Sequence, residues 1–275
     1  MFNLAISSAP TTAIMRTPYY DLQTTLTVMK SLLKDRAVDG FEVQHLAEWS
    51  KEHPPRDDVT GDRRIAWEKS LKYTTEDLLS HLEGLPVFSV HANRDVGILL
   101  CGNSQDQKKG KEMVEQSLVL AETLQAGVCV FHLWDTWKRN LDMAALGKWL
   151  GEVTPSFAVK ASVENVPTHI ESTTPRGLVE HFEWITLDMR WAAKYNELKA
   201  FESVRDRIIN VHLRGTLENA AWVLNNSPFG FWEALDTIES WGYSGLVTME
   251  PEGGLSSGNW EDLVTAMLSI RKYLE

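Results

Sequence analysis

Short apolar runs alternate with longer amphipathic stretches along most of the chain. Runs with few polar interruptions are typical of parallel strands that are buried on both faces of a sheet. Amphipathic stretches, whose apolar residues recur every three or four positions, predict helices that cover such a sheet. The apolar runs predict eight strands, at residues 3–7, 40–44, 87–91, 128–132, 158–164, 184–188, 208–213 and 245–250. The amphipathic stretches predict helices at about residues 21–33, 75–83, 107–125, 141–150, 175–182, 191–204, 231–241 and 260–274.

Eight strand-helix units in succession predict an α/β fold, a closed (β/α)8 barrel formed as a single domain by residues 1–275. A doubly wound open sheet is the main competitor. It is disfavoured because residues 7–15, after the first strand, contain no GxGxxG loop of the kind that binds dinucleotide phosphates. Residues 48–73 form a polar segment without predicted structure, since Pro54-Pro55 and Gly61-Asp62 break any helix there.

The composition narrows the range of partners. The chain has 38 acidic and 27 basic residues and a net charge of -11, which disfavours binding to nucleic acid or to an anionic membrane. Cys101 and Cys129 form neither a metal-binding spacing nor a disulfide framework, so a reducing compartment is expected. The amino-terminal residues MFNLAISSAP lack the features of a signal peptide, and no apolar run is as long as a membrane span. These features predict a cytoplasmic protein that acts on a small molecule.

Ionisable residues end four successive apolar runs in the second half of the chain. They are Glu164, Asp188, His212 and Glu250. In a barrel, side chains at the carboxyl-terminal ends of the strands converge at one place, where the active site lies. Three carboxylates and an imidazole suit one divalent cation; the oxygen-rich set favours Mn or Mg, and the imidazole leaves Zn, Co or Fe open.

Five further residues are candidates for substrate binding, and each has a structural alternative. Glu42, His91 and His132 lie at the ends of three earlier strands, where buried charges need partners. The two histidines could instead donate to backbone carbonyls, and Glu42 could pair with an arginine inside the barrel. Arg214 could clamp a phosphate or carboxylate, or be structural. Trp191 could lie against a sugar, or only pack.

Seven motifs occur in an order that resembles a known family. They are DGFEVQ, SVHANRDVGILLCGNSQDQKKG, GVCVFH, VENVP, LDMRW, NVHLRG and TMEPEGG, at strands two to eight. The set is similar to that of the xylose-isomerase-like barrels, which include sugar-phosphate isomerases and epimerases, ketose 3-epimerases and endonuclease IV-like proteins. The resemblance implies a single divalent metal ion whose ligands are Glu164, Asp188, His212 and Glu250. It also implies that His91 and His132 line the pocket.

Two departures from the family pattern bear on the reaction. Family members often have a histidine where this chain has Trp191, and an acidic residue soon after the strand-seven histidine, where it has Leu213-Arg214-Gly215. A three-zinc DNA nuclease needs both of those extra ligands, so that activity is disfavoured. In ketose epimerases the missing histidine contacts the substrate, so the substitution puts the substrate in question.

Two carboxylates that face each other across a metal ion suit proton transfer. A metal-bound hydroxy-carbonyl compound has an acidified C-H, and one carboxylate can remove the proton while the other returns it. Glu164 and Glu250 are the predicted pair, and we predict a metal-dependent isomerase or epimerase of a sugar, sugar phosphate or related compound. A metal-dependent hydrolase or lyase and a non-catalytic ligand-binding barrel are the alternatives. Pairing of the exposed helices into a homo-oligomer is also possible for such a barrel.

Overall fold

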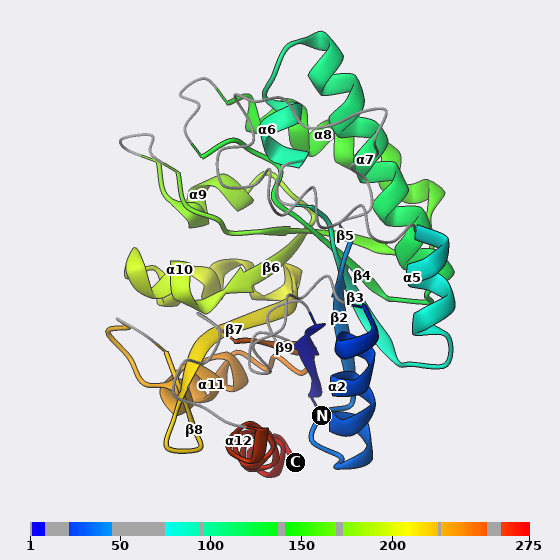
Figure 1. Ribbon diagram of the computed structural model, residues 1–275. Helices are drawn as coiled ribbons and strands as arrows, with labels where there is room; N and C mark the ends of the chain where they lie inside the picture. Colours follow the sequence, from blue (N-terminus) through cyan, green and yellow to red (C-terminus); the bar gives the residue numbers. More distant parts are fainter. Residues whose placement is uncertain are drawn as a thin grey trace.

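The computed structural model describes residues 2–8, 22–45, 75–93, 96–136, 141–168, 173–224, 227–251 and 260–275 (Figure 1). The segment 48–73, for which the sequence predicts no structure, lies outside these ranges. Among the described residues, no helix is both long and apolar enough to cross a membrane.

Eight parallel strands of the described chain form a closed barrel, which confirms the predicted fold class. Each strand pairs with the next one in the barrel, and the last returns to the first, because Ile6 of β1 lies opposite both Phe41 of β2 and Met249 of β9. The barrel strands are β1 (Asn3–Ser7), β2 (Gly40–Gln44), β3 (Val87–His91), β4 (Val128–Phe131), β5 (Lys160–Glu164), β6 (Trp184–Asp188), β7 (Ile208–Glu218) and β9 (Leu246–Pro251).

Helices surround the strands, and the core lies between the two layers. Figure 1 shows α2 and α5 on one side of the barrel and α9 and α10 on another. Apolar side chains from the outward faces of the strands pack against the apolar faces of the helices in one continuous cluster. The helices of this layer are α2 (Leu22–Lys34), α5 (Thr75–Leu82), α7 (Ser104–Thr123), α8 (Met143–Val153), α9 (Pro175–Val179), α10 (Met189–Lys194), α11 (Phe231–Ser240) and α12 (Trp260–Leu274).

Helix α7 begins three residues before the predicted start at residue 107, because a capping box fixes its first turn. The Asn103 side chain accepts hydrogen bonds from the backbone N-H groups of Gln105 and Asp106, at 2.9 and 3.0 Å. The Asp106 carboxylate in turn accepts from the N-H of Asn103 at 3.1 Å. The apolar periodicity does not register this polar first turn, which is why the prediction started too late.

The predicted helix 191–204 is wrong as a single element. Helix α10 ends at Lys194, and a separate 3-10 helix, η3 (Leu198–Arg207), follows it. Between them Asn196 has a φ of 52°, a left-handed conformation that asparagine tolerates better than most residues and that ends an α-helix.

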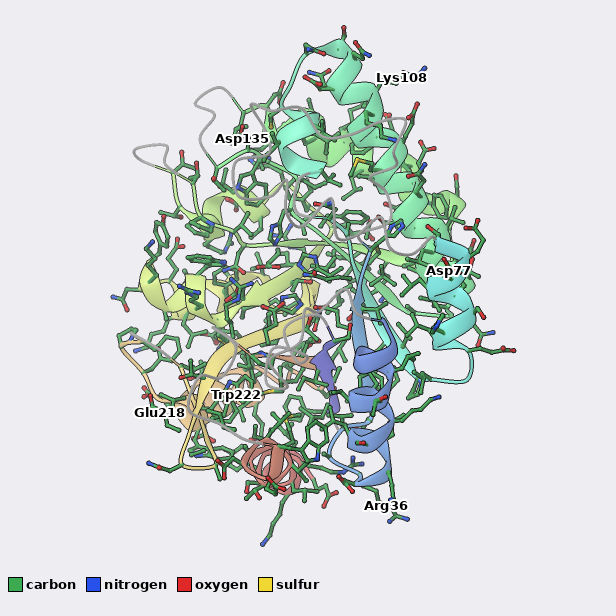
Figure 2. The ribbon with its side chains drawn as sticks, viewed as in Figure 1. Arg36, Asp77, Lys108, Asp135, Glu218 and Trp222 are labelled. Atoms are coloured by element: carbon green, nitrogen blue, oxygen red, sulfur yellow. The ribbon has the colours of Figure 1, made fainter. Side chains whose placement is uncertain are left out.

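Three short elements were not predicted, and one of them is the 3-10 helix η2 (Thr154–Ser156). Helix α6 (Val96–Leu100) follows β3, and its Gly97 approaches the backbone of His132 and Trp134 so closely that an added Cβ would lie 2.6 Å from Trp134. Strand β8 (Ala221–Val223) folds back antiparallel on the end of β7, which extends past the barrel (Figure 2 labels Glu218 and Trp222 of this hairpin). Gly215 makes room for the buried Trp222 ring, since a Cβ at that position would collide with it.

Candidate active site

The ionisable residues at the strand ends gather in the closed barrel, and their side chains are buried. Glu164, Asp188 and His212 are 0% exposed, and Glu250 is 6% exposed. Glu42 is also 0% exposed, His91 is 3% exposed, and His132, directly after β4, is partly buried. The expected convergence of these seven residues is therefore present, although they come from seven different strands or strand ends.

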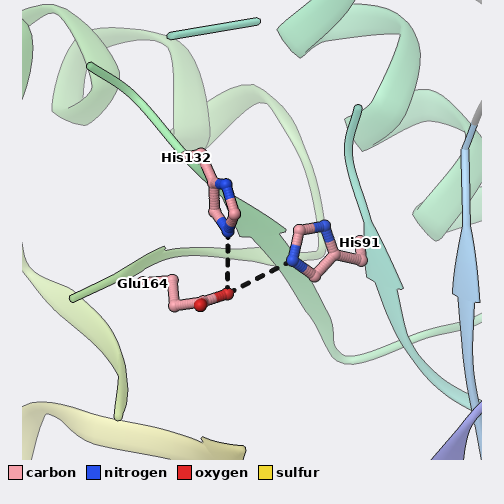
Figure 3. A group of neighbouring side chains, drawn as sticks. All are labelled: His91, His132 and Glu164. Atoms are coloured by element: carbon pink, nitrogen blue, oxygen red, sulfur yellow. Dashed lines mark hydrogen bonds and ion pairs between the residues drawn. The ribbon is translucent and has the colours of Figure 1, made fainter. Parts of the chain in front are cut away.

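Glu164 lies at the centre of a group of histidines. Its Oε2 is 3.2 Å from Nε2 of His91 and 3.0 Å from Nε2 of His132 (Figure 3). His91 donates from Nδ1 to the carbonyl of Ala92 at 2.8 Å, which leaves Nε2 to face the carboxylate. The backbone contact that was the structural alternative for His91 is thus present together with a contact inside the site.

His212 lies between three of the buried carboxylates. Its Nε2 is 3.1 Å from Oε2 of Glu42, which also accepts a hydrogen bond from the Ser89 hydroxyl at 2.9 Å. Its Nδ1 is 3.3 Å from Glu164 and 3.4 Å from Oε1 of Glu250. With an ion bound, a proton on Nε2 would satisfy Glu42 and Nδ1 would be left to bind the ion, the arrangement found in carboxylate-histidine-metal groups. Within the described residues Glu42 therefore pairs with His212, and not with the arginine that was its structural alternative.

Arg214 lies between Glu250 and the fourth carboxylate, Asp188. Its Nε and Nη2 donate to Oε2 of Glu250 at 3.0 and 2.9 Å, and its Nη1 lies 3.7 Å from Oδ2 of Asp188. The other Asp188 oxygen accepts from the backbone N-H groups of Arg190 and Trp191, at 2.7 and 3.4 Å, and so caps α10. Asp188 is held on both sides, and its Oδ2 is the oxygen that faces the site.

Burial and charge shift the pKa values of this group in opposite directions. Burial raises the pKa of Asp188 to about 7, although Arg214 opposes this shift. Burial also favours the neutral forms of Glu164 and His212. The attraction between these two residues, together with the charges of neighbouring imidazoles and carboxylates, outweighs this effect of burial. The pKa of Glu164 is held well below its usual range, and that of His212 well above. The cluster is thus charged, with positive imidazole balancing part of the carboxylate charge.

Three of the four predicted metal ligands each keep a buried polar atom that lacks a hydrogen-bond partner within the described residues. These atoms are Oε1 of Glu164, Oδ2 of Asp188 and Nδ1 of His212. Leaving such a group unpaired costs roughly 1–3 kcal/mol, more for a charged one, and a divalent cation would satisfy oxygen and nitrogen donors together. The residues present therefore fit a metal ion.

Two overlapping sets of ligand atoms are compact enough to hold an ion. His91, His132 and Glu164 form one set, and His91, His212 and Glu250 form the other, with the atoms of each set within 4.8 Å of one another. Asp188 belongs to neither set and reaches Glu250 through Arg214. The close approach of His91 and His132 to Glu164 was not predicted from the sequence, which assigned those histidines to the pocket wall.

A second polar layer lies directly below the site, and it too was not predicted. Thr248 donates to Asn210 at 2.9 Å, Asn210 lies 3.0 Å from His212, and Ser162 contacts Thr186. Each member stands two positions before a strand-end residue, and such pairs point to the same side of a strand. The repeated pattern of polar, apolar, ionisable (SVH, SVE, TLD, NVH, TME) was the available signal. The fully buried members of this layer are Ser89, Ser162, Thr186, Asn210 and Thr248.

The same fold occurs in solved structures of low sequence identity. A D-tagatose 3-epimerase-like protein matches 99% of this chain and 97% of its own, with 18% identity and a TM-score of 0.64. A xylose isomerase domain containing protein from Salmonella typhimurium LT2 covers 99% and 97%, with 14% identity and a TM-score of 0.62. The IolI protein, solved with a zinc atom, covers 99% and 98%, with 12% identity and a TM-score of 0.64. No protein-family model and no curated protein matches the chain.

The raised pKa of Asp188 predicts how the metal-free protein responds to pH. Because the folded chain raises the pKa from 3.8 to about 7, the contribution of Asp188 to stability is fully present below the unfolded value and is lost as the pH rises through about 7. Asp188→Asn cannot ionise, so its stability relative to the wild type should increase by about 1–3 kcal/mol between about pH 5 and about pH 8. Urea denaturation of both proteins after chelation measures this difference. Asp206→Asn, at a side chain that is 95% exposed, is the control; equal pH dependence of all three proteins would contradict the prediction.

The eight-stranded barrel and the matches over nearly the whole chain identify the fold. The chain has the fold of the xylose-isomerase-like (β/α)8 barrels, and the resemblance read from its motifs is confirmed at the level of fold.

Proposed function

We propose that this protein is a divalent-metal-dependent isomerase or epimerase of a sugar, a sugar phosphate or a related hydroxy-carbonyl compound. Its metal ligands would be Glu164, Asp188, His212 and Glu250. The observation that carries the proposal is the set of buried, unpartnered ligand atoms on three of these four residues within the described chain. The names of structural neighbours, a D-tagatose 3-epimerase-like protein and a zinc-bound IolI, support it.

When bound, the ion would supply positive charge that stabilises the oxygen charge developing as a neighbouring C-H loses its proton. Glu164 and Glu250 are then placed to move that proton. Oε2 of Glu250 is held by Arg214, so its Oε1 is the oxygen free to exchange a proton. Oε1 of Glu164, which lacks a partner among the described residues, would bind the ion, so Oε2, which faces His91 and His132, is the oxygen that would exchange the proton.

In each carboxylate one oxygen would thus be fixed, by the ion in Glu164 and by Arg214 in Glu250, and the other oxygen would move the proton. This division supports a two-base reaction. The anchored oxygens fix the orientation of the side chains, and the low exposure of the site strengthens the electrostatic interactions there. Removal of a proton from one face of a substrate carbon by one carboxylate, and return of a proton to the opposite face of the same carbon by the other, would give epimerisation. Return of the proton to the adjacent carbon would give isomerisation.

A metal-dependent hydrolase is the second candidate, and one observation favours it. His91, His132 and Glu164 form a compact set of two imidazoles and a carboxylate, which is a donor set of catalytic zinc sites that activate water. Such an enzyme would cleave an ester or phosphodiester, with no exchange of substrate carbon-bound hydrogen.

Glu164→Gln tests the proton-transfer role. The amide keeps the size of the side chain but is no base, so metal-dependent exchange of a carbon-bound proton of a ketose in deuterated water should fall by a factor of about 10²–10⁴. Proton NMR measures the exchange, and circular dichroism checks the fold. Glu112→Gln, on the exposed face of α7, is the matched control. Exchange at the wild-type rate in the Glu164 variant would contradict the proton-transfer role of this residue. Ester cleavage by the wild type without any such exchange would favour the hydrolase.

Glu42→Gln tests whether this carboxylate orients His212 for a metal ion. Loss of the negative charge behind Nε2 should weaken binding of Mn²⁺ or Zn²⁺ to the metal-free protein by about 10- to 100-fold. Isothermal titration calorimetry measures the affinity. Ser89→Ala removes only a hydrogen bond to Glu42 and should have a smaller effect. Unchanged affinity in the Glu42 variant would show that His212 needs no such partner.

A further inference from the structure

Three cations surround the indole ring of Trp191. The guanidinium of Arg190 lies 5.1 Å from the ring centre, Nζ of Lys194 lies at 5.6 Å, and the guanidinium of Arg214 lies at 5.8 Å. The whole chain carries a net charge of -11, so three positive side chains around one ring stand out against its overall negative charge.

The cluster adjoins the proposed metal ligands directly. The backbone N-H groups of Arg190 and Trp191 both bind Oδ1 of Asp188, and the Arg214 side chain binds Glu250. Arg214 is 23% exposed, while Arg190 and Lys194 are exposed. The positive charge therefore extends from the buried carboxylates to exposed side chains beside the proposed metal site.

Two groups of this cluster have donors to spare. Nε1 of Trp191 is buried and has no hydrogen-bond partner within the described part of the chain. Arg214 uses Nε and Nη2 on Glu250, whereas its Nη1 makes only the 3.7 Å ion pair with Asp188. The unpartnered indole N-H and the Arg214 guanidinium, which lies 5.8 Å from the centre of the same ring, can both donate to acceptor oxygens, and an oxyanion supplies several at once.

We propose that Trp191, Arg190 and Arg214 form a subsite for an anionic oxygen group of the substrate, with Lys194 adding charge. The inference rests on the proposed function and narrows its substrate class to hydroxy-carbonyl compounds that carry a phosphate or carboxylate away from the reacting carbons. Neutral ketoses offer these donors only hydroxyl groups. Trp191 stands where family members often have a substrate-contacting histidine. The proposed subsite thus gives this chain a different substrate preference at that position.

The experiment compares a neutral ketose with two ligands of the same carbon chain that carry an anionic group at its end. Isothermal titration calorimetry measures binding of D-fructose, D-fructose 6-phosphate and the corresponding six-carbon keto-uronate to the Mn²⁺-loaded wild type and to variants. The anionic ligands should bind about 10-fold or more tightly than D-fructose, because charge-assisted hydrogen bonds are the stronger ones. Arg190→Ala should remove most of this preference, Arg190→Lys should retain part of it, and Trp191→Phe should reduce it by loss of the N-H.

Arg205→Ala is the matched control, because it removes the same charge at the amino-terminal end of the barrel, next to the start of β7. A preference for only the phosphate ligand, or for only the carboxylate ligand, would support the subsite and show which of the two anionic groups it binds. Equal binding of charged and neutral ligands, including no binding of either, would overturn the proposal, as would equal effects of the Arg190 and Arg205 variants.

The same titrations separate this proposal from the proposed function. If Mn²⁺ binds but the anion preference is absent, the subsite is wrong and the metal site stands. If no divalent ion binds but the preference persists in the metal-free protein, the subsite stands and the metal-dependent function is wrong.

Discussion

The constraint on which the site depends is the burial of four carboxylates in one small region of the barrel. Glu42, Glu164 and Asp188 are completely inaccessible, and Glu250 is nearly so. Like charges at this density are unfavourable without positive partners in the same region. His212 lies within ion-pair distance of Glu42, Glu164 and Glu250. Arg214 pairs with Glu250 and approaches Asp188. The positions of these two basic residues therefore decide which carboxylate oxygens remain open for a ligand.

The barrel supplies the positions at which such a group can form. Parallel strands bring ionisable residues distant in sequence to a common end, and the period of two along each strand places a second polar residue beneath each one. Hydrogen bonds such as that from Thr248 to Asn210 satisfy this lower layer. Side chains that are fixed from below have fewer rotamers open to them, so the donors are held in place for a ligand.

Much of this could be predicted from sequence, because strands buried on both faces are visible as apolar runs and an ionisable residue at the end of each run is conspicuous. The identity of each side chain's partner could not be predicted in the same way. Glu42 and His212 are separated by 170 positions, and nothing in their spacing shows that one supports the other. The end of α10 depends on a single left-handed residue, Asn196, which the periodicity of the surrounding apolar residues does not reveal. Trp191 was recognised as a departure from the family pattern, but its position among three cations needed the structure.

The most direct test of the proposed metal site is anomalous diffraction from crystals grown with a divalent metal such as Zn²⁺ or Mn²⁺. The proposed metal site predicts one anomalous peak at about 2.0–2.3 Å from ligand atoms of Glu164, Asp188, His212 and Glu250. Its density should be weakened in crystals of the His212→Ala variant. A crystal soaked in the metal that shows no peak among these four residues, or a single peak held by His91, His132 and Glu164 alone, would contradict it.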